Sequence, residues 1–218
     1  MRKTIGKLFL ILMLLVIYAP ILILAVYSFT DSGNIGSIHG FSMQNYVTLF
    51  TKGELRDMIV GTVLLALVSS LLATIFGTMG AIGAFYSKKL AKNFINTANQ
   101  IPVVNADVVT GFSICVLLIV AFGMNKESYV PLLIGHVVLS APFVYLSVVP
   151  KLKQMDASLY EAAMDLGASP SMALRKVVIP QIMPGIVSGF ALAITLSLDD
   201  YFIASYTKPA TFNTISTY

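Results

Sequence analysis

Five long apolar segments separated by short polar ones dominate the pattern of the chain. They lie near residues 8–29, 58–86, 101–123, 129–149 and 181–206. A helix of about 20 apolar residues crosses the ~30 Å hydrocarbon core of a bilayer, and each segment is long enough to do so. None shows the alternation of a barrel strand, which needs only about 10 residues. The pattern predicts an all-α membrane protein, a bundle of five transmembrane helices in one domain over residues 1–218.

Composition and charge support this arrangement and suggest an orientation. The chain is 57% hydrophobic and only 11% charged. With a cytoplasmic N-terminus, most of the 14 basic residues fall on the inner side, as the positive-inside rule requires. The net charge of +4 is then a topology signal, and without a basic face no nucleic-acid partner is expected. The first apolar segment is too long for a signal peptide core of ~7–15 residues, so we expect it to be retained.

Isolated reactive residues inside the spans predict little chemistry. Cys115 is the only cysteine and cannot form an internal disulfide. His136 has no nearby set of metal ligands, so we interpret it as a hydrogen-bonded residue between helices and expect no metal site. The third span is interrupted by Pro102, Asn105 and Asp107. A break there would have to face protein or water, because freed backbone groups cannot face lipid.

Small residues recur at four-residue spacing in two of the spans. Ala73, Gly77 and Ala81 form one row, and Gly185 and Gly189 form another. Small side chains let helix backbones approach closely in lipid. We expect both rows to pack against other helices of the same chain.

A polar stretch, residues 151–179, lies between the last two apolar segments and carries strong helix signals. Ser158 and Glu161 match a capping box, and Gly167 suits the left-handed end of a helix. Ser169 followed by Pro170 predicts the start of a second helix, which Pro180 is expected to close. Such an ordered polar hairpin exceeds what joining two spans requires. It therefore predicts a docking site for a soluble partner.

The residues of this hairpin resemble a known motif. Glu161, Ala162 and Ala163, then Gly167, then Ile179-Pro180 are similar to the EAA motif of binding-protein-dependent ABC importer permeases. The stretches LYEAAMDLGAS, LRKVVIP and TLSLDDYFIASY resemble the spermidine/putrescine branch of that family. The family has six spans, so the resemblance implies a further span after residues 207–218 that this sequence lacks.

The resemblance also implies partners and a mechanism. The hairpin would be a cytoplasmic coupling helix, in which Glu161, Ala162, Ala163, Asp165 and Gly167 contact a separate ATPase. The implied partners are a pair of ATPase subunits, a second permease and an extracytoplasmic polyamine-binding protein in a bacterial cytoplasmic (inner) membrane. The sequence has no G-x-x-x-x-G-K-[ST] loop, so ATP and Mg²⁺ are expected on the partner and no catalytic residue or cofactor on this chain.

Acidic residues in apolar segments are the candidates for a substrate pathway, because carboxylates in a membrane are costly. Asp199 and Asp200 lie near the end of the fifth segment and are followed by Tyr201. Paired acids beside an aromatic ring suit a cationic solute, since a ring face attracts a cation by ~0.5–2 kcal/mol. Either acid could instead cap a helix break or pair with a partner subunit. Asp107 is a further candidate, although capping of the broken third span explains it better.

Other functions remain open at this point. A permease of the same family could carry a metal ion or an oxyanion, although an anion pathway should prefer Arg, Lys or helix N-termini. An ion-coupled secondary transporter would work alone and would not need the hairpin, and no inverted repeat is visible. A membrane scaffold explains neither the hairpin nor the acids, and an intramembrane enzyme lacks a nucleophile with a base.

Overall fold

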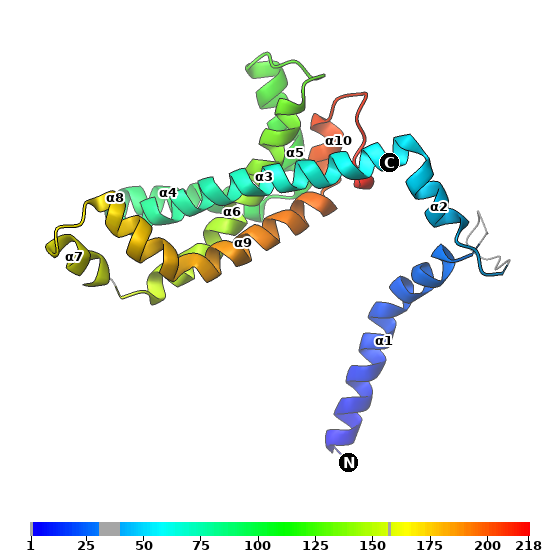
Figure 1. Ribbon diagram of the computed structural model, residues 1–218, viewed down its shortest axis with the longest axis horizontal. Coiled ribbons are helices and arrows are strands. Elements are labelled where there is room, and N and C mark those ends of the chain that lie inside the picture. Colours follow the sequence, from blue (N-terminus) through cyan, green and yellow to red (C-terminus); the bar gives the residue numbers. More distant parts are fainter. Residues whose placement is uncertain (1, 31–39, 157) are drawn as a thin grey trace. The chain divides into compact units, whose positions relative to one another are not determined.

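The computed structural model describes residues 2–30, 40–156 and 158–218, and every regular element in these ranges is a helix (Figure 1). The prediction of an all-α protein is therefore confirmed. The only β contact in the described ranges is an isolated bridge between Thr30 and Phe41. The elements are α1 (Arg2–Ser28), α2 (Gln44–Thr51), α3 (Gly53–Tyr86), α4 (Lys89–Val104), α5 (Asp107–Cys115), η1 (Val116–Ala121), α6 (Tyr129–Gln154), α7 (Ser158–Asp165), α8 (Pro170–Ala173), η2 (Leu174–Val178), α9 (Ile179–Asp199), α10 (Phe202–Thr207) and η3 (Ile215–Thr217).

Within the described ranges, four helices are long and apolar enough to cross a membrane, and a bent pair brings the number to five. The four are Gly6–Ser28, Gly53–Tyr86, Tyr129–Gln154 and Pro170–Asp199. The bent pair is α4 with α5 and η1, and the helix direction bends by 108° at the break between them. The break falls at Asn105 and Ala106, whereas Pro102 lies inside α4 and does not end it. The predicted third span 101–123 therefore includes the end of α4, the break, and the second arm Asp107–Ala121, so it is not one straight helix.

The chain divides into two compact units, Met1–Asp57 and Met58–Tyr218. In the first unit, α2 packs on the end of α1. Tyr46 shares a hydrogen bond of 2.9 Å with the Ser28 hydroxyl, and the Asn45 amide donates to the Thr30 carbonyl at 2.9 Å. The side chains of the apolar span in α1 are exposed within this unit. The prediction of one domain over residues 1–218 stays a prediction.

In the second unit, α6 packs against both α3 and α9 through glycines. A Cβ on Gly77 of α3 would lie 2.7 Å from the Ala141 carbonyl of α6, and a Cβ on Gly185 of α9 would lie 2.9 Å from that of Ser147. These backbones therefore approach more closely than any side chain allows. The predicted internal packing of the small-residue rows is confirmed. The core around these contacts contains Ala81, Ala84, Val144, Tyr145, Val148, Leu152, Val178, Ile182 and Ala193.

The last α-helix, α10, packs against both α5 and α6. Its Ile203 is fully buried, 3.1 Å at the Cα from where a Cβ on Gly111 of α5 would lie. On its other side, a Cβ on Gly135 of α6 would come within 2.5 Å of the Ile203 Cγ2. Two glycines thus form the slot that holds Ile203. The chain after α10 returns to α3, where Ile215 donates its N–H to the Thr62 hydroxyl at 3.1 Å.

Pro180 does not close the second hairpin helix, contrary to the prediction. Helices α8, η2 and α9 form one continuous helix of 30 residues, Pro170–Asp199. A proline removes one backbone donor and crowds the carbonyl four residues earlier. Here the turn before it widens to a π-helix, and the Ile179 N–H bonds to the Leu174 carbonyl five residues back. The wide turn accommodates Pro180 without ending the helix.

The same helix ends earlier than the predicted span 181–206. It stops at Asp199, and a new helix starts at Phe202. At 1.5 Å per residue the helix is roughly 45 Å long, which exceeds the ~30 Å hydrocarbon core. Figure 1 shows α7 and α8 at one end of this unit and α10 toward the other. The long helix therefore connects the polar hairpin directly to the interruption at Asp199 and Asp200, which we call the acidic break.

Candidate functional site

The polar hairpin is an exposed structure whose turn is held entirely by local bonds. Gly167 has φ +86°, in the left-handed region, as predicted. The Ala168 N–H bonds to the Ala163 carbonyl at 3.0 Å, and the Gly167 N–H bonds to that of Met164 at 2.9 Å. These two bonds form the Schellman motif, in which a left-handed glycine ends a helix and satisfies its last carbonyls.

The start of α8 follows the prediction, whereas the start of α7 does not. Ser169 caps α8 by accepting the N–H of Met172 at 3.4 Å, with Pro170 in the first turn. Ser158, however, is the first residue of α7 rather than its cap, and no capping-box bond to Glu161 is found among the described residues. The Asp156 carboxylate accepts the Ser158 N–H at 3.0 Å instead. Hydrogen bonds from the backbone and hydroxyl of Ser158 hold the pKa of Asp156 below its usual value.

The residues predicted to couple to an ATPase lie on the surface of this hairpin. Glu161, Ala162, Asp165 and Gly167 are exposed, and Ala163 is half-buried. The hairpin contacts the rest of the unit through Tyr160, whose ring centroid lies 4.9 Å from that of Tyr86 at the end of α3. Leu166 is 90% exposed at the tip of the hairpin. The hairpin thus presents exposed residues on a turn held by backbone hydrogen bonds, together with the exposed apolar side chain of Leu166.

The predicted acidic pair at the other end of the long helix separates into two different environments. Asp199 ends α9, is exposed, and has no hydrogen bond or ion pair within the described ranges. Asp200 is buried, with 8% of its surface exposed. Its carboxylate accepts the N–H of Ile203 at 3.2 Å and of Ala204 at 2.7 Å. Asp200 therefore caps α10, one of the two roles that the sequence left open.

His136 of α6 completes the surroundings of Asp200. Its Nε2 lies 3.7 Å from Asp200 Oδ2, and both side chains are almost fully buried. Asp107 begins α5 on the surface and is close enough to Asp200 for the two charges to interact. The sequence indicated a hydrogen-bonded His136 between helices, but it gave no signal that its partner is Asp200. Tyr201 is half exposed, and its ring meets that of Phe202 edge to face at 5.4 Å.

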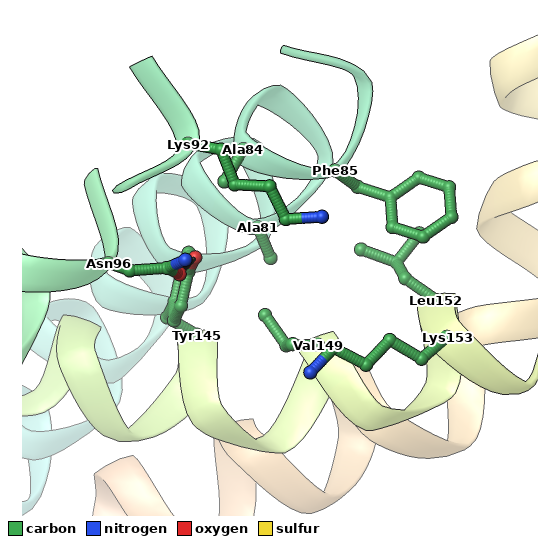
Figure 2. Close-up of a pocket in the computed structure, with 9 residues that line it drawn as sticks. All are labelled: Ala81, Ala84, Phe85, Lys92, Asn96, Tyr145, Val149, Leu152 and Lys153. Carbon is green, nitrogen blue, oxygen red and sulfur yellow. Dashed lines mark hydrogen bonds between the residues drawn. The ribbon is translucent and has the colours of Figure 1, made fainter. Parts of the chain in front are cut away.

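A separate pocket lies near the hairpin end of the same unit, between the ends of α3, α4 and α6 (Figure 2). Lys92 and Lys153 reach into it from different helices, and Tyr145 donates a hydrogen bond to Asn96 at its edge. Both charged groups in the lining are cationic. This pocket therefore does not suit a cationic solute, and the acids that would suit one lie at the far end of α9.

Comparison with known proteins agrees with this architecture. The chain matches the family described as "Binding-protein-dependent transport system inner membrane component" over residues 77–217. It is 32% identical over 190 residues to the spermidine/putrescine transport system permease protein PotC of Escherichia coli (strain K12), covering 87% of this chain and 71% of that one. It is also 32% identical over 195 residues to the putrescine transport system permease protein PotI of the same strain, covering 87% and 69%.

A solved structure shares the fold. The crystal structure of an amino acid ABC transporter with histidines matches 71% of this chain and 72% of its own, with a TM-score of 0.50 and 22% identity. The helices and their lengths define a multi-pass α-helical membrane protein. The chain belongs to the family of binding-protein-dependent transport system inner membrane components, as its match over residues 77–217 shows.

Proposed function

We propose that this chain is a permease subunit of an ATP-driven importer for polyamines such as spermidine and putrescine. The observation that carries the proposal is the continuous helix Pro170–Asp199. It joins an exposed hairpin, suited to docking, to an exposed carboxylate, suited to a cation. The names of the similar proteins PotC and PotI support polyamines as the cation class.

The hairpin is the coupling element in this proposal. Glu161, Ala162, Ala163, Asp165 and Gly167 contact the ATPase, and Leu166 enters an apolar part of its surface. Leu166 is 90% exposed, so covering it would stabilise the complex by ~25 cal/mol per Å² of apolar area removed from water. Closure of the ATPase then moves one end of the long helix. The rigid helix transmits that movement to the acidic break, which gives alternating access.

The acidic break is the cation-binding part of the pathway. Asp199 is exposed and has no partner in the described part of the chain, so its charge is available to an ammonium group. Tyr201, half exposed beside it, adds a ring face to the same surface. Asp107 begins α5, which packs against α10, and contributes a second exposed negative charge. A polyamine carries several ammonium groups and suits such spaced acids.

The proposed assembly contains a PotA-like pair of ATPases, a PotB-like second permease and a PotD-like extracytoplasmic polyamine-binding protein. ATP and Mg²⁺ reside on the ATPases, and this chain carries no cofactor. The assembly resides in the bacterial cytoplasmic membrane, with the N-terminus and the hairpin on the cytoplasmic side. The excess of basic residues on that side supports this orientation.

The test is uptake by the complete transporter. The chain is expressed with the products of its neighbouring genes in cells unable to take up polyamines, and entry of radiolabelled spermidine is measured with a panel of competitors. We expect saturable uptake that putrescine inhibits and that stops when the ATPase cannot hydrolyse ATP. Competition by a metal ion or an oxyanion, with none by polyamines, would assign another substrate. Uptake that continues without ATP hydrolysis would favour an ion-coupled transporter.

A further inference from the structure

His136 and Asp200 form a buried contact between α6 and the start of α10. Their side chains are 1% and 3% exposed, and Nε2 lies 3.7 Å from Oδ2. The Nε2 atom has no hydrogen-bond partner in the part of the chain that the structure describes, and the Asp200 carboxylate is the charged group that faces it. A buried polar nitrogen directed at a carboxylate indicates a specific function for the pair, because unpaired buried polar groups are rare.

The hydrogen bonds around the ring determine where its protons lie. His136 Nδ1 lies 2.9 Å from the carbonyl of Leu132, which can only accept, so Nδ1 carries a hydrogen. In neutral His136 the Nε2 would then present a lone pair to Asp200 Oδ2, and an ionised carboxylate would present another. Two acceptors repel each other. A proton on Nε2 or on Oδ2 would remove this conflict and let the two side chains attract each other.

The carboxylate of Asp200 is fully engaged in this arrangement. Oδ1 accepts from Ile203, and Oδ2 accepts from Ala204 and faces His136. Turning it toward a transported cation would leave two backbone N–H groups at the start of α10 unpaired inside the protein. Its neighbour Asp199 is exposed and makes no hydrogen bond within the described ranges. The two adjacent acids therefore differ in what they can bind.

We propose that His136 is a positioning residue that keeps Asp200 turned into the first turn of α10, so that Asp199 alone of the two acids meets the transported cation. This rests on the proposed function for the identity of the cation. The contact also lies at the start of α10, one turn before Ile203, which packs between Gly111 and Gly135. Since Asp199 lies next to Asp200 in the chain, a shift of the cap would displace the transport acid.

The first experiment separates the two acids in the complete transporter. Asp199→Asn and Asp200→Asn are compared by the concentration dependence of spermidine uptake, normalised to the amount of transporter in the membrane. Loss of a charged partner should raise the KM of Asp199→Asn about tenfold or more. Asparagine keeps one of the two oxygens that accept backbone N–H groups and loses the other, so Asp200→Asn should raise the KM less than Asp199→Asn, by no more than a few-fold. An equal rise of the KM in both variants would overturn the proposal.

The second experiment tests whether a polar group at the position of His136 Nε2 is needed. His136→Gln places an amide donor near the position of Nε2, whereas His136→Leu has similar bulk and no donor. We expect His136→Leu to lower the thermal unfolding midpoint of the purified transporter and to raise the KM, and His136→Gln to restore both. A glutamine variant as impaired as the leucine variant, or a leucine variant without effect, would contradict the positioning role.

A third experiment tests the positioning role even if the transported solute is not a polyamine. Thermal unfolding of Asp200→Ala and Asp199→Ala needs no substrate, and only the first should lower the midpoint. A transporter that takes up no polyamine but shows this difference would refute the proposed substrate and keep the positioning role. Equal midpoints for the two alanine variants would refute the positioning role whatever is transported.

Discussion

At one end of the helix Pro170–Asp199 the chain turns through Gly167 and Ser169, and at the other it turns through Asp200 and Tyr201. Both turns satisfy the backbone groups that a helix end leaves unpaired. The hairpin turn is exposed and uses only bonds from nearby residues, such as Ser169 to Met172. At the acidic turn Asp200 is buried, faces His136 of α6 at 3.7 Å, and its carbonyl accepts a hydrogen bond from the Ser216 hydroxyl.

The difference follows from the surroundings of the two turns. Water can replace a missing bond at the hairpin, so a short local turn suffices there. Inside the bundle an unpaired group costs about 1–3 kcal/mol, so the buried turn needs partners from other elements. The exposed end is therefore held by its own turn alone, whereas the buried end is fixed by the rest of the chain.

The largest effect is expected from Gly167→Val. Its φ of +86° is strained for any side chain, at roughly 1–2 kcal/mol for an ordinary residue and more for a β-branched one. The hairpin should change shape and ATP-driven uptake should fall by about tenfold or more, measured against the amount of transporter in the membrane. Gly83→Val is the matched control, since a Cβ on Gly83 also meets nothing within 4 Å but its φ is ordinary. Equal uptake by both variants would show that the turn does not matter for coupling.

The next effect is expected from Leu166→Glu, which changes the tip of the hairpin without changing its fold. Because this side chain is 90% exposed, the unfolding midpoint of the chain should stay within about a degree or two. Co-purification of the ATPase should fall severalfold, because a charge would have to be buried in the contact. Leu166→Met should keep the association. ATPase recovery unaffected by Leu166→Glu would place the contact elsewhere.

A smaller effect is expected from Gly135→Ala at the buried end. The new Cβ would lie 2.5 Å from Ile203 Cγ2, and Ile203 is fully buried. Overpacking of this kind costs about 1–3 kcal/mol, which should lower the unfolding midpoint by several degrees. The same change at Gly80, where the nearest atom is 3.7 Å away, should be neutral or stabilising. Equal midpoints for the two variants would contradict the tight slot around α10.

The smallest effect is expected from acidification at the start of α7. The pKa of Asp156 is lowered by its bonds from Ser158, so its contribution to the helix start is complete at neutral pH. It should be lost as the pH falls through the lowered pKa, because the protonated carboxyl is a weaker acceptor. The protection factors of the α7 amides, which compare their hydrogen exchange with that of an unfolded chain at the same pH, should therefore fall in acid. In Asp156→Asn this extra pH dependence should disappear, and if it persisted the cap would have another origin.

The local features of the hairpin were predictable because their signals lie in adjacent residues. Gly167 and the Ser169-Pro170 pair have intrinsic backbone preferences, and both occupy the predicted conformations. The prediction for Pro180 was wrong because proline ends a helix only when the preceding turn cannot widen, and sequence does not show whether it can. Ser158 was wrongly assigned as a cap because Asp156, two residues earlier, offers a stronger acceptor.

The acidic end could be predicted only in part. The apolar pattern placed Asp199 and Asp200 near the end of a span, but periodicity does not indicate which of two adjacent acids faces inward. That depends on the break at Asp200 and on His136, which is distant in the sequence. Pairing of this kind arises from tertiary packing. The slot formed by Gly111 and Gly135 was likewise invisible, since neither glycine belongs to a repeated row.

The wide turn at Leu174–Val178 has a consequence for how the two ends face each other. One residue of an α-helix corresponds to about 100° of rotation, and a π-turn holds about one residue more than an α-turn. This segment therefore determines how far the hairpin is rotated about the helix axis relative to Asp199. Gaining or losing one such turn would rotate the hairpin about the helix axis relative to Asp199, with every side chain at either end retained.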